Sequence, residues 1–206
     1  MLRVENIETF GFVGAMRGMR NPMNSWAKQD SYYEDDTEII GPNDLDLLLR
    51  LTKAGTEHRK ALRAMHIQMD VTAPLYWWKE FDTYKIGTVA NSCSTMHKIQ
   101  TKKFVLDDFS HEHLDVVGRS CLEGTITMLN TYRDFYNDGK NKNDWWGMIQ
   151  LLPSSYNQTR TIDMNYEVAL NMLKQRQSHK LDEWITLCNT MVRELPYLPQ
   201  LKEASK

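Results

Sequence analysis

A stretch of strictly alternating apolar and polar residues is the feature that most constrains the fold of this chain. From Met65 to Val71, four apolar residues alternate with His66, Gln68 and Asp70. This period of two predicts a half-buried strand. Most other apolar residues recur every three or four positions, which is the period of an amphipathic helix. Because the predicted helices outnumber the strands and do not alternate regularly with them, we expect an α+β fold and not a doubly wound sheet.

Helical periodicity and turn residues define the other expected elements. We expect the first forty residues to be the least regular and Asn91–Thr95 to form a loop, and we expect a second strand over Gln158–Met164. Six helices are predicted from N-caps, glycine or proline stops and apolar stripes. They run from an N-cap at Asn43 to Gly55, over Leu75–Phe81 after Pro74, from a cap at Ser110 to about Tyr136, over Trp145–Leu152, over Tyr166–Gln175, and over about Lys180–Leu195.

Composition limits the classes of protein to which the chain can belong. Its 206 residues contain no repeat or Pro/Ser-rich linker, so we expect one domain over residues 1–206. The net charge of −2 gives no general reason to bind duplex nucleic acid. No apolar run approaches the roughly 20 residues that span a bilayer, and the three cysteines suit no disulfide framework. We therefore expect a cytoplasmic protein with no membrane partner.

Several common catalytic motifs are absent from the sequence. It contains no GxGxxG or P-loop glycine motif, no HExxH and no GxSxG. His111-Glu112-His113 could suggest a metal cluster, but residues two apart on a helix point in different directions, so we expect a solvated helix turn and no metal site. The pairs Trp77-Trp78 and Trp145-Trp146 could wall a planar ligand or pack in the core, and core packing is favoured.

The junction of the last two predicted helices is the clearest candidate site that the residues alone provide. Arg176-Gln177-Ser178-His179 places a guanidinium and an imidazole within one turn. That combination suits an anion or a polarised heterocycle. Taken alone, the motif does not define a reaction.

Two stretches of the chain carry a recognisable order of motifs. In the first, His58 precedes the strand, Ala73-Pro74 opens the aromatic helix, and a small polar segment, Asn91-Ser92-Cys93-Ser94, follows. In the second, the order is Leu152-Pro153, a strand, Asn165, Asn171, Arg176 and Ser178-His179. Together they resemble the flavin-dependent thymidylate synthases, the ThyX family, in a divergent and phage-like form. The resemblance implies mixed helices around a small antiparallel sheet.

The resemblance also implies an activity, its cofactors and its partners. The reaction would be reductive methylation of dUMP to dTMP, with methylenetetrahydrofolate as carbon donor, FAD as cofactor and NADPH as reductant. The family uses no enzymic cysteine nucleophile, and it forms homotetramers with flavin sites between subunits. Carried over residue by residue, Arg176 would be catalytic and would contact the substrate. The implied cofactor contacts are His58, Lys85, Asn165, Asn171 and His179, and the further substrate contacts are Glu80, Ser92, Cys93 and Ser94.

The chain departs from the family at its most basic motifs. The family's Arg-His-Arg falls on Thr83-Tyr84-Lys85, and its Ser-x-Arg falls on Cys93-Ser94-Thr95. Only Lys85 keeps a positive charge, and a lysine lacks the bidentate fork of arginine. Three alternatives therefore stay open: a protein of this fold that binds or sequesters a nucleotide without turnover, an enzyme acting on another pyrimidine nucleotide, and a plain helical interaction domain.

Overall fold

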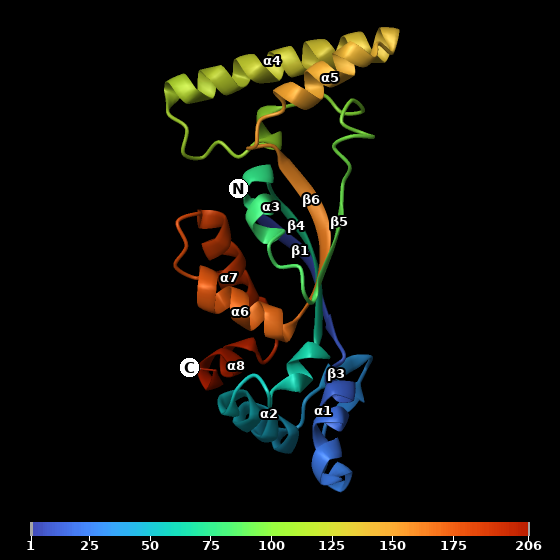
Figure 1. Ribbon diagram of the computed structural model, residues 1–206, viewed down its shortest axis with the longest axis vertical. Helices are drawn as coiled ribbons and strands as arrows, with labels where there is room; N and C mark the ends of the chain where they lie inside the picture. The colour runs from blue at the N-terminus through green and yellow to red at the C-terminus, as the bar shows by residue number, and fades with distance from the viewer. Residues whose placement is uncertain (1, 206) are drawn as a thin grey trace. The chain divides into compact units, whose positions relative to one another are not determined.

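The computed structural model describes residues 2–205, and its elements form an α+β fold around a small sheet (Figure 1). A four-stranded sheet has the order β1-β4-β6-β5, and β2 pairs with β3 in a separate antiparallel hairpin. The strands are β1 (Arg3–Phe10), β2 (Tyr32–Glu34), β3 (Thr37–Ile39), β4 (His66–Pro74), β5 (Thr88–Ser92) and β6 (Asn157–Asn165). The α-helices are α1 (Phe12–Arg20), α2 (Pro42–Ala54), α3 (Leu75–Phe81), α4 (Val116–Gly139), α5 (Lys142–Leu151), α6 (Tyr166–Arg176), α7 (Asp182–Glu194) and α8 (Leu198–Ala204).

The predicted fold class and most predicted elements are confirmed. Strand β4 buries Ile67, Met69 and Val71 while His66 and Gln68 stay half-buried, as the alternation required. The six predicted helices correspond to α2 to α7, and the second predicted strand corresponds to β6. The plain helical domain is wrong because a four-stranded sheet is present.

The ends of several predicted elements are wrong. Helix α4 starts after Asp115, whose carboxylate accepts a hydrogen bond from the Gly118 amide at 2.8 Å, and not after Ser110. Gly41 and not Asn43 precedes α2. Asn91 and Ser92 extend β5 instead of lying in a loop. The first forty residues contain β1, α1 and the β2–β3 hairpin, and α8 was not predicted at all.

The chain divides into two compact units, each of which includes part of the four-stranded sheet. The first consists of the N-terminal end through Arg3, Val71–Thr83 and Asn91–Arg160. The second consists of Val4–Asp70, Tyr84–Ala90 and Thr161 to the C-terminal end. The prediction of a single domain stays a prediction.

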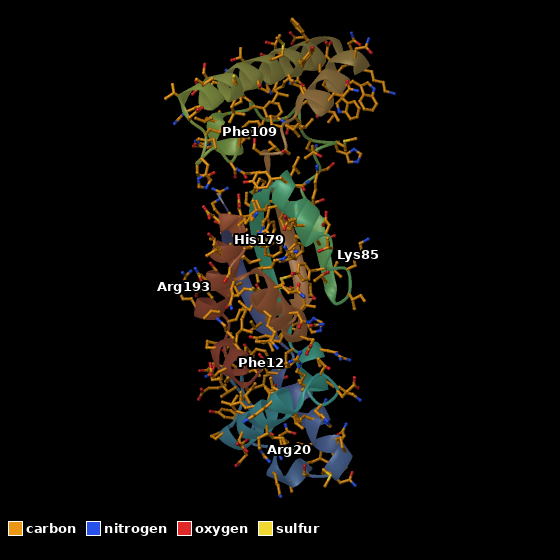
Figure 2. All side chains as sticks on the ribbon, turned by 60° about the vertical axis from the view of Figure 1, so that its left-hand side comes forward. Phe12, Arg20, Lys85, Phe109, His179 and Arg193 are labelled. Carbon is orange, nitrogen blue, oxygen red and sulfur yellow. The ribbon has the colours of Figure 1, made fainter. Side chains whose placement is uncertain are left out.

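An aromatic and aliphatic core supports α4 and α5 in the first unit, and these two helices run side by side (Figure 1). Phe109 lies in this core, under α4 (Figure 2). Trp77 and Trp78 on α3 are both fully buried, which confirms core packing for this pair. In the second pair Trp145 is half-buried and Trp146 is exposed, so core packing is wrong for Trp146. The Trp78 indole donates a hydrogen bond to the Gln158 carbonyl at 2.9 Å, which ties α3 to β6.

Two buried ion pairs stabilise the second unit. Arg20 donates to the Asp44 carboxylate at 2.6 Å, and Arg59 forms two hydrogen bonds with Glu167, of 2.7 and 2.8 Å. Burial alone would raise the pKa of Asp44, but hydrogen bonds from Ser31 and Arg20 lower it below its ordinary value. Arg59 and Glu167 join the segment that follows His58 to the first turn of α6. No helix among the described residues is both long and apolar enough to cross a membrane.

Candidate functional site

Helix α6 carries the predicted site residues Asn171 and Arg176, Asn165 caps its start and His179 follows its end, and the segment Tyr84–Gly87 runs along it. At the start of α6, the Asn165 side chain accepts a hydrogen bond from the Val168 amide at 3.0 Å. The Asn165 amide donates to the Gly87 carbonyl at 3.4 Å. Gly87 has a φ of 75°, and a Cβ at this position would lie 2.6 Å from the Asn165 Nδ2 atom. Glycine is therefore required for this close approach.

The other end of the segment contacts the end of α6. The Tyr84 hydroxyl donates to the Gln175 Oε1 atom at 2.8 Å and accepts from the Arg176 Nε atom at 3.0 Å. The Arg176 guanidinium carbon lies 4.8 Å from the Trp184 ring centroid, at cation–π distance. Arg176 is thus held between a phenol and an indole. We name Tyr84, Gln175, Arg176 and Trp184 the arginine clamp.

His179 lies beside this clamp. Its ring meets the Trp184 ring edge-on, with centroids 6.3 Å apart. Its Nδ1 atom accepts a hydrogen bond from the Leu181 amide at 3.1 Å, so in the neutral ring the proton is on Nε2. The two residues that the sequence placed within one turn are therefore together in space.

Lys85 and Asn171 lie outside the clamp. Lys85 and its neighbour Ile86 are exposed, and Figure 2 shows Lys85 on the loop that follows α3. Asn171 is half-buried on α6. Both occur on the two elements that Tyr84 and Gly87 join, so the structure brings Lys85, Asn165, Asn171, Arg176 and His179 to one region of the second unit.

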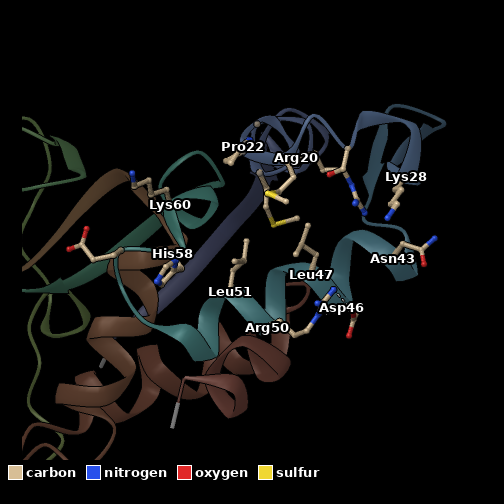
Figure 3. Close-up of a pocket in the computed structure, with 15 residues that line it drawn as sticks. Arg20, Pro22, Lys28, Asn43, Asp46, Leu47, Arg50, Leu51, His58 and Lys60 are labelled. Atoms are coloured by element: carbon tan, nitrogen blue, oxygen red, sulfur yellow. Dashed lines mark hydrogen bonds and ion pairs between the residues drawn. The ribbon is translucent and has the colours of Figure 1, made fainter.

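His58 faces a separate cavity of about 930 Å³ between α1, α2 and the segment that follows α2 (Figure 3). Its walls are partly apolar, and its cationic groups are Lys28, Arg50, Lys60 and Arg20, the last of which pairs with Asp44. The apolar lining consists of Met19, Pro22, Met23, Leu47 and Leu51. The volume lies in the range of about 300–1,000 Å³ typical of small-molecule sites. His58 therefore borders a space large enough for a cofactor.

The predicted substrate residues other than Arg176 lie in the first unit. Cys93 and Ser94 line a smaller cavity of about 270 Å³, together with Arg3 and Lys102. The Cys93 amide donates to the Thr159 carbonyl at 2.9 Å, which fixes this segment on β6. The Ser94 hydroxyl accepts hydrogen bonds from the Met96 and His97 amides, and these bonds turn the chain.

The lining of this smaller cavity is polar but carries no clear excess of charge. The Lys102 ammonium pairs with the Asp108 carboxylate at 2.7 Å. Burial and the Asp108 charge raise the pKa of Tyr156, which keeps its phenol protonated and able to donate. Glu80 and Ser92 do not line this cavity; the Glu80 carbonyl instead accepts hydrogen bonds from Thr83.

Sequence reasoning missed the partners that hold these residues. Tyr84 was recognised only as a replacement for a family histidine, and Trp184 only as part of an apolar stripe. Arg160 is held over the Trp78 ring at 4.3 Å and pairs with Asp82 at 2.7 Å. No spacing rule relates positions so far apart in the chain. The tyrosine at position 84, where the family has a basic motif, was a usable signal of a changed contact.

Comparison with solved structures identifies proteins that share this fold. A crystal structure of the flavin-dependent thymidylate synthase ThyX from Helicobacter pylori, complexed with FAD and dUMP, matches with a TM-score of 0.70 and 18% identity. The match covers 99% of this chain and 100% of that one. A second crystal structure of this enzyme with FAD and dUMP gives a TM-score of 0.71 and 18% identity, with both chains fully covered.

The chain has the fold of the flavin-dependent thymidylate synthases. A UMP/dUMP methylase, PolB from Streptomyces cacaoi bound with 5-Br dUMP, shares this fold with a TM-score of 0.67 and 14% identity. That match covers 99% of this chain and 94% of PolB. No protein-family model matches the chain, and no curated protein matches its sequence. The ThyX resemblance inferred from motif order is therefore confirmed at the level of fold.

Proposed function

We propose that this chain is a flavin-dependent thymidylate synthase, which converts dUMP to dTMP. The observation that carries the proposal is the end-to-end fold likeness to ThyX structures that hold FAD and dUMP. In the balanced reaction, C5 of dUMP exchanges its proton for the methylene carbon of methylenetetrahydrofolate. Tetrahydrofolate leaves, and a hydride that comes from NADPH reduces the methylene group to methyl.

The residues around His58 fit a flavin nucleotide. A planar ring needs apolar walls, which Leu47 and Leu51 supply, and a pyrophosphate needs cations, which Lys60 and Arg50 supply. The bound flavin would deliver the hydride, and the protein would position the reactants and stabilise charge. His58, Lys60 and Arg50 would hold the flavin. Lys85, Asn165, Asn171 and His179 do not line this cavity, so their cofactor roles are a separate part of the proposal.

Arg176 would stabilise the negative charge that develops on the pyrimidine ring. A guanidinium fixed in advance by Tyr84 and Trp184 needs little reorganisation when that charge appears. Cys188 is no competing nucleophile, because burial raises the pKa of its thiol to about 11. The substrate roles of Glu80, Ser92, Cys93 and Ser94, and the homotetramer, are part of the same proposal.

The test is direct. The absorbance spectrum of the purified chain should show bound flavin after incubation with FAD, and dTMP should form only when dUMP, methylenetetrahydrofolate and NADPH are all present. Omitting each component in turn is the control. A colourless protein that takes up no FAD and forms no dTMP would disprove the proposal.

A second candidate is a nucleotide-binding protein without turnover. One observation favours it: the Arg176 guanidinium already donates to Tyr84, which stands in the altered Arg-His-Arg motif, and lies over Trp184. Calorimetry with a panel of nucleotides separates the two, because tight binding without flavin or turnover supports only the second. Comparing dUMP with dCMP and UMP in the same assay tests the third alternative, another pyrimidine nucleotide.

A further inference from the structure

An acidic turn ends the β2–β3 hairpin of the second unit. Glu34 lies opposite Thr37, which leaves Asp35 and Asp36 as a two-residue turn. Their φ angles are 44° and 64°, and a type I′ turn requires positive φ at both positions. Glu34, Asp35 and Asp36 are exposed, and no described residue forms an ion pair with any of the three. We name these three residues the acidic tip.

The hairpin holds the acidic tip on a fixed support. The Glu38 carboxylate accepts hydrogen bonds from the Tyr33 hydroxyl at 2.9 Å and from the Phe12 amide at 2.6 Å, which ties β3 to the start of α1. Directly after β3, the Ile40 amide donates to the Tyr197 hydroxyl at 2.9 Å. A group that is held in place before it binds loses little conformational freedom on binding. The tip is therefore suited to a specific contact.

A cationic cavity of about 370 Å³ lies in the first unit, where α4 ends and α5 begins, and we name it the junction cavity. Its lining contains no acidic residue, so the field inside is positive. Asp138 and Asp144 are near in the chain but do not line it. The lining consists of Met96, His97, Gln100, Tyr136, Lys140, Lys142 and Trp145. A helix with its side chains is about 10–12 Å across, so a cavity of this volume suits the side chains of a turn better than a helix.

Two lysines supply most of the positive charge of the junction cavity. Lys140 has a φ of 53° and ends α4, with its amide donating to the Tyr136 carbonyl at 2.8 Å. Lys142 occupies the first turn of α5, where the helix dipole favours an anion. Both lysines are exposed, and no carboxylate of a described residue pairs with either ammonium group. The acidic tip has neighbouring carboxylates to match them.

Aromatic side chains accompany the charges on both surfaces. In the junction cavity, Trp145 is half-buried and donates to the carbonyl of the exposed Met96 at 3.2 Å, and Tyr136 is half-buried beside Lys140. Tyr32 and Tyr33, directly before the acidic tip, are both exposed. Tyrosine, tryptophan and methionine are enriched at protein–protein interfaces. The two surfaces are therefore complementary in charge and alike in their aromatic content.

We propose that the acidic tip of one copy of this chain docks in the junction cavity of a second copy. Lys140 and Lys142 pair with the tip carboxylates, and Tyr32 and Tyr33 lie against the Trp145 side of the cavity. Opposite charges of this kind fix which surfaces meet. Because every copy carries both parts, a two-fold pair makes the contact twice. The inference shares self-association with the proposed function, but the contact needs no flavin, folate or nucleotide, and its test measures assembly apart from dTMP formation.

Sedimentation velocity of the full-length chain over a range of concentrations measures the self-association. The cavity variant Lys140→Glu/Lys142→Glu should raise the dissociation constant of the assembly more than tenfold. The control Lys79→Glu/Lys103→Glu makes the same charge change at two exposed lysines of the same unit outside the lining, and should leave the constant within twofold. A natural chain that stays monomeric, or a cavity variant that assembles like the control, overturns the proposal, whether or not dTMP forms.

The tip variant Glu34→Gln/Asp35→Asn/Asp36→Asn removes the acidic charge but keeps the turn, because asparagine also adopts positive φ. It should weaken the assembly as much as the cavity variant does. The tip variant keeps an intact cavity and the cavity variant keeps an intact tip, so unlike copies can form one of the two contacts.

Mixing the two variants therefore tests whether the contact joins different copies. Fluorescence anisotropy should show that a labelled tip variant binds the cavity variant at least threefold more tightly than either variant binds itself. A mixture that binds no more tightly than the separate variants contradicts docking between copies and overturns the proposal. Circular dichroism and thermal melts confirm that each variant folds.

Discussion

Arg176 is useful to a reaction only if its guanidinium is held in one orientation, and Tyr84 is the residue that holds it. The phenol bridges Gln175 and Arg176, while Trp184 covers the guanidinium. Tyr84 is therefore a positioning residue within the proposed function. Because its hydroxyl acts through Arg176, removing it should change catalysis without changing the fold.

Removing that hydroxyl should lower kcat while leaving the fold intact. Tyr84→Phe loses a hydrogen bond to a charged group, a loss of about 1.5–3 kcal/mol, which corresponds to a decrease of roughly 10–100-fold in kcat. Steady-state kinetics with dUMP should show KM changing much less than kcat. Tyr33→Phe, which removes an exposed hydroxyl from the β2–β3 hairpin, is the matched control. Equal kinetics for both variants would contradict the role of Tyr84.

The buried pair Arg20–Asp44 should dominate the acid sensitivity of the second unit. Asp44→Asn leaves a buried guanidinium without its partner charge, so we expect a loss of about 3–5 kcal/mol in the free energy of unfolding. Asp46→Asn removes an exposed partner of Arg50 and should cost about 0–1 kcal/mol. Urea unfolding at neutral pH measures both values, and a comparable cost for the two variants would be the contrary result.

The pH dependence of the same pair has a defined sign. The pKa of Asp44 is lower in the folded chain than the value of about 3.9 that is ordinary for a free aspartate. Its contribution to stability is therefore fully present above that ordinary value and is lost as the pH falls through the folded pKa. Thermal midpoints recorded from pH 7 down to pH 3 should fall more steeply for the natural chain than for Asp44→Asn.

At the scale of elements, α4 carries an exposed stripe that the fold leaves uncovered. Val117, Cys121, Gly124, Met128 and Phe135 are all exposed, and successive members follow a spacing of three, four or seven. This is the repeat with which helices pair, and a glycine in such a stripe lets two helices approach closely. A helix of 24 residues is about 36 Å long, which is enough for an extensive contact. The stripe suits a second copy of the chain, in agreement with the proposed homotetramer.

Gly124→Leu tests that stripe without disturbing the chain itself. A Cβ at Gly124 would meet no atom within 4 Å, so the variant should fold normally, and helix propensity even favours it by a few tenths to about 1 kcal/mol. We expect a smaller assembly by analytical ultracentrifugation, with an unchanged circular dichroism spectrum. Ser120→Leu, on the flank of the stripe, is the control. An unchanged assembly in Gly124→Leu would show that copies do not pair through this face.

How well the sequence predicted each element depended on whether a local pattern or a distant partner in the chain specifies that element. The alternation before Val71 and the stripe that ends at Leu195 are local patterns of burial, so β4 and α7 were predictable. Strand β1 has exposed and half-buried residues in irregular order and gains its partner from β4, far along the chain. The start of α4 was misplaced because both Ser110 and Asp115 are good N-cap residues, and only the backbone decides between them.

The candidate site was predictable in its members but not in its geometry. Motif order identified Arg176 and Asn165 on one helix. It could not reveal that Tyr84 and Gly87 tie a second segment to both ends of that helix, because those contacts join residues more than 75 positions apart. It also could not predict that His58 borders a cavity of about 930 Å³, which forms only when α1 and α2 pack together.

At the scale of the whole molecule, a net charge of −2 conceals a local concentration of cations. The cavity beside His58 is lined by Arg20, Lys28, Arg50 and Lys60, while the lining supplies only Asp46 and Glu57 as acids. Because Arg20 is paired with Asp44 and Arg50 with Asp46, the remaining positive charge at the cavity comes from the two lysines, set against Glu57. An anionic ligand with an apolar body would gain from both parts of this lining.

Binding of FAD should therefore raise the thermal midpoint of the whole chain. At a concentration about 100 times Kd, a ligand that binds only the folded state adds about 2.7 kcal/mol, and each kcal/mol is worth about 2–4 °C for a chain of this size. Lys60→Glu should abolish most of that increase. Lys53→Glu makes the same charge change on the same part of the chain but outside this cavity, and should retain the increase. If both variants lose the shift, general charge and not this cavity attracts the flavin; if both keep it, FAD binds elsewhere.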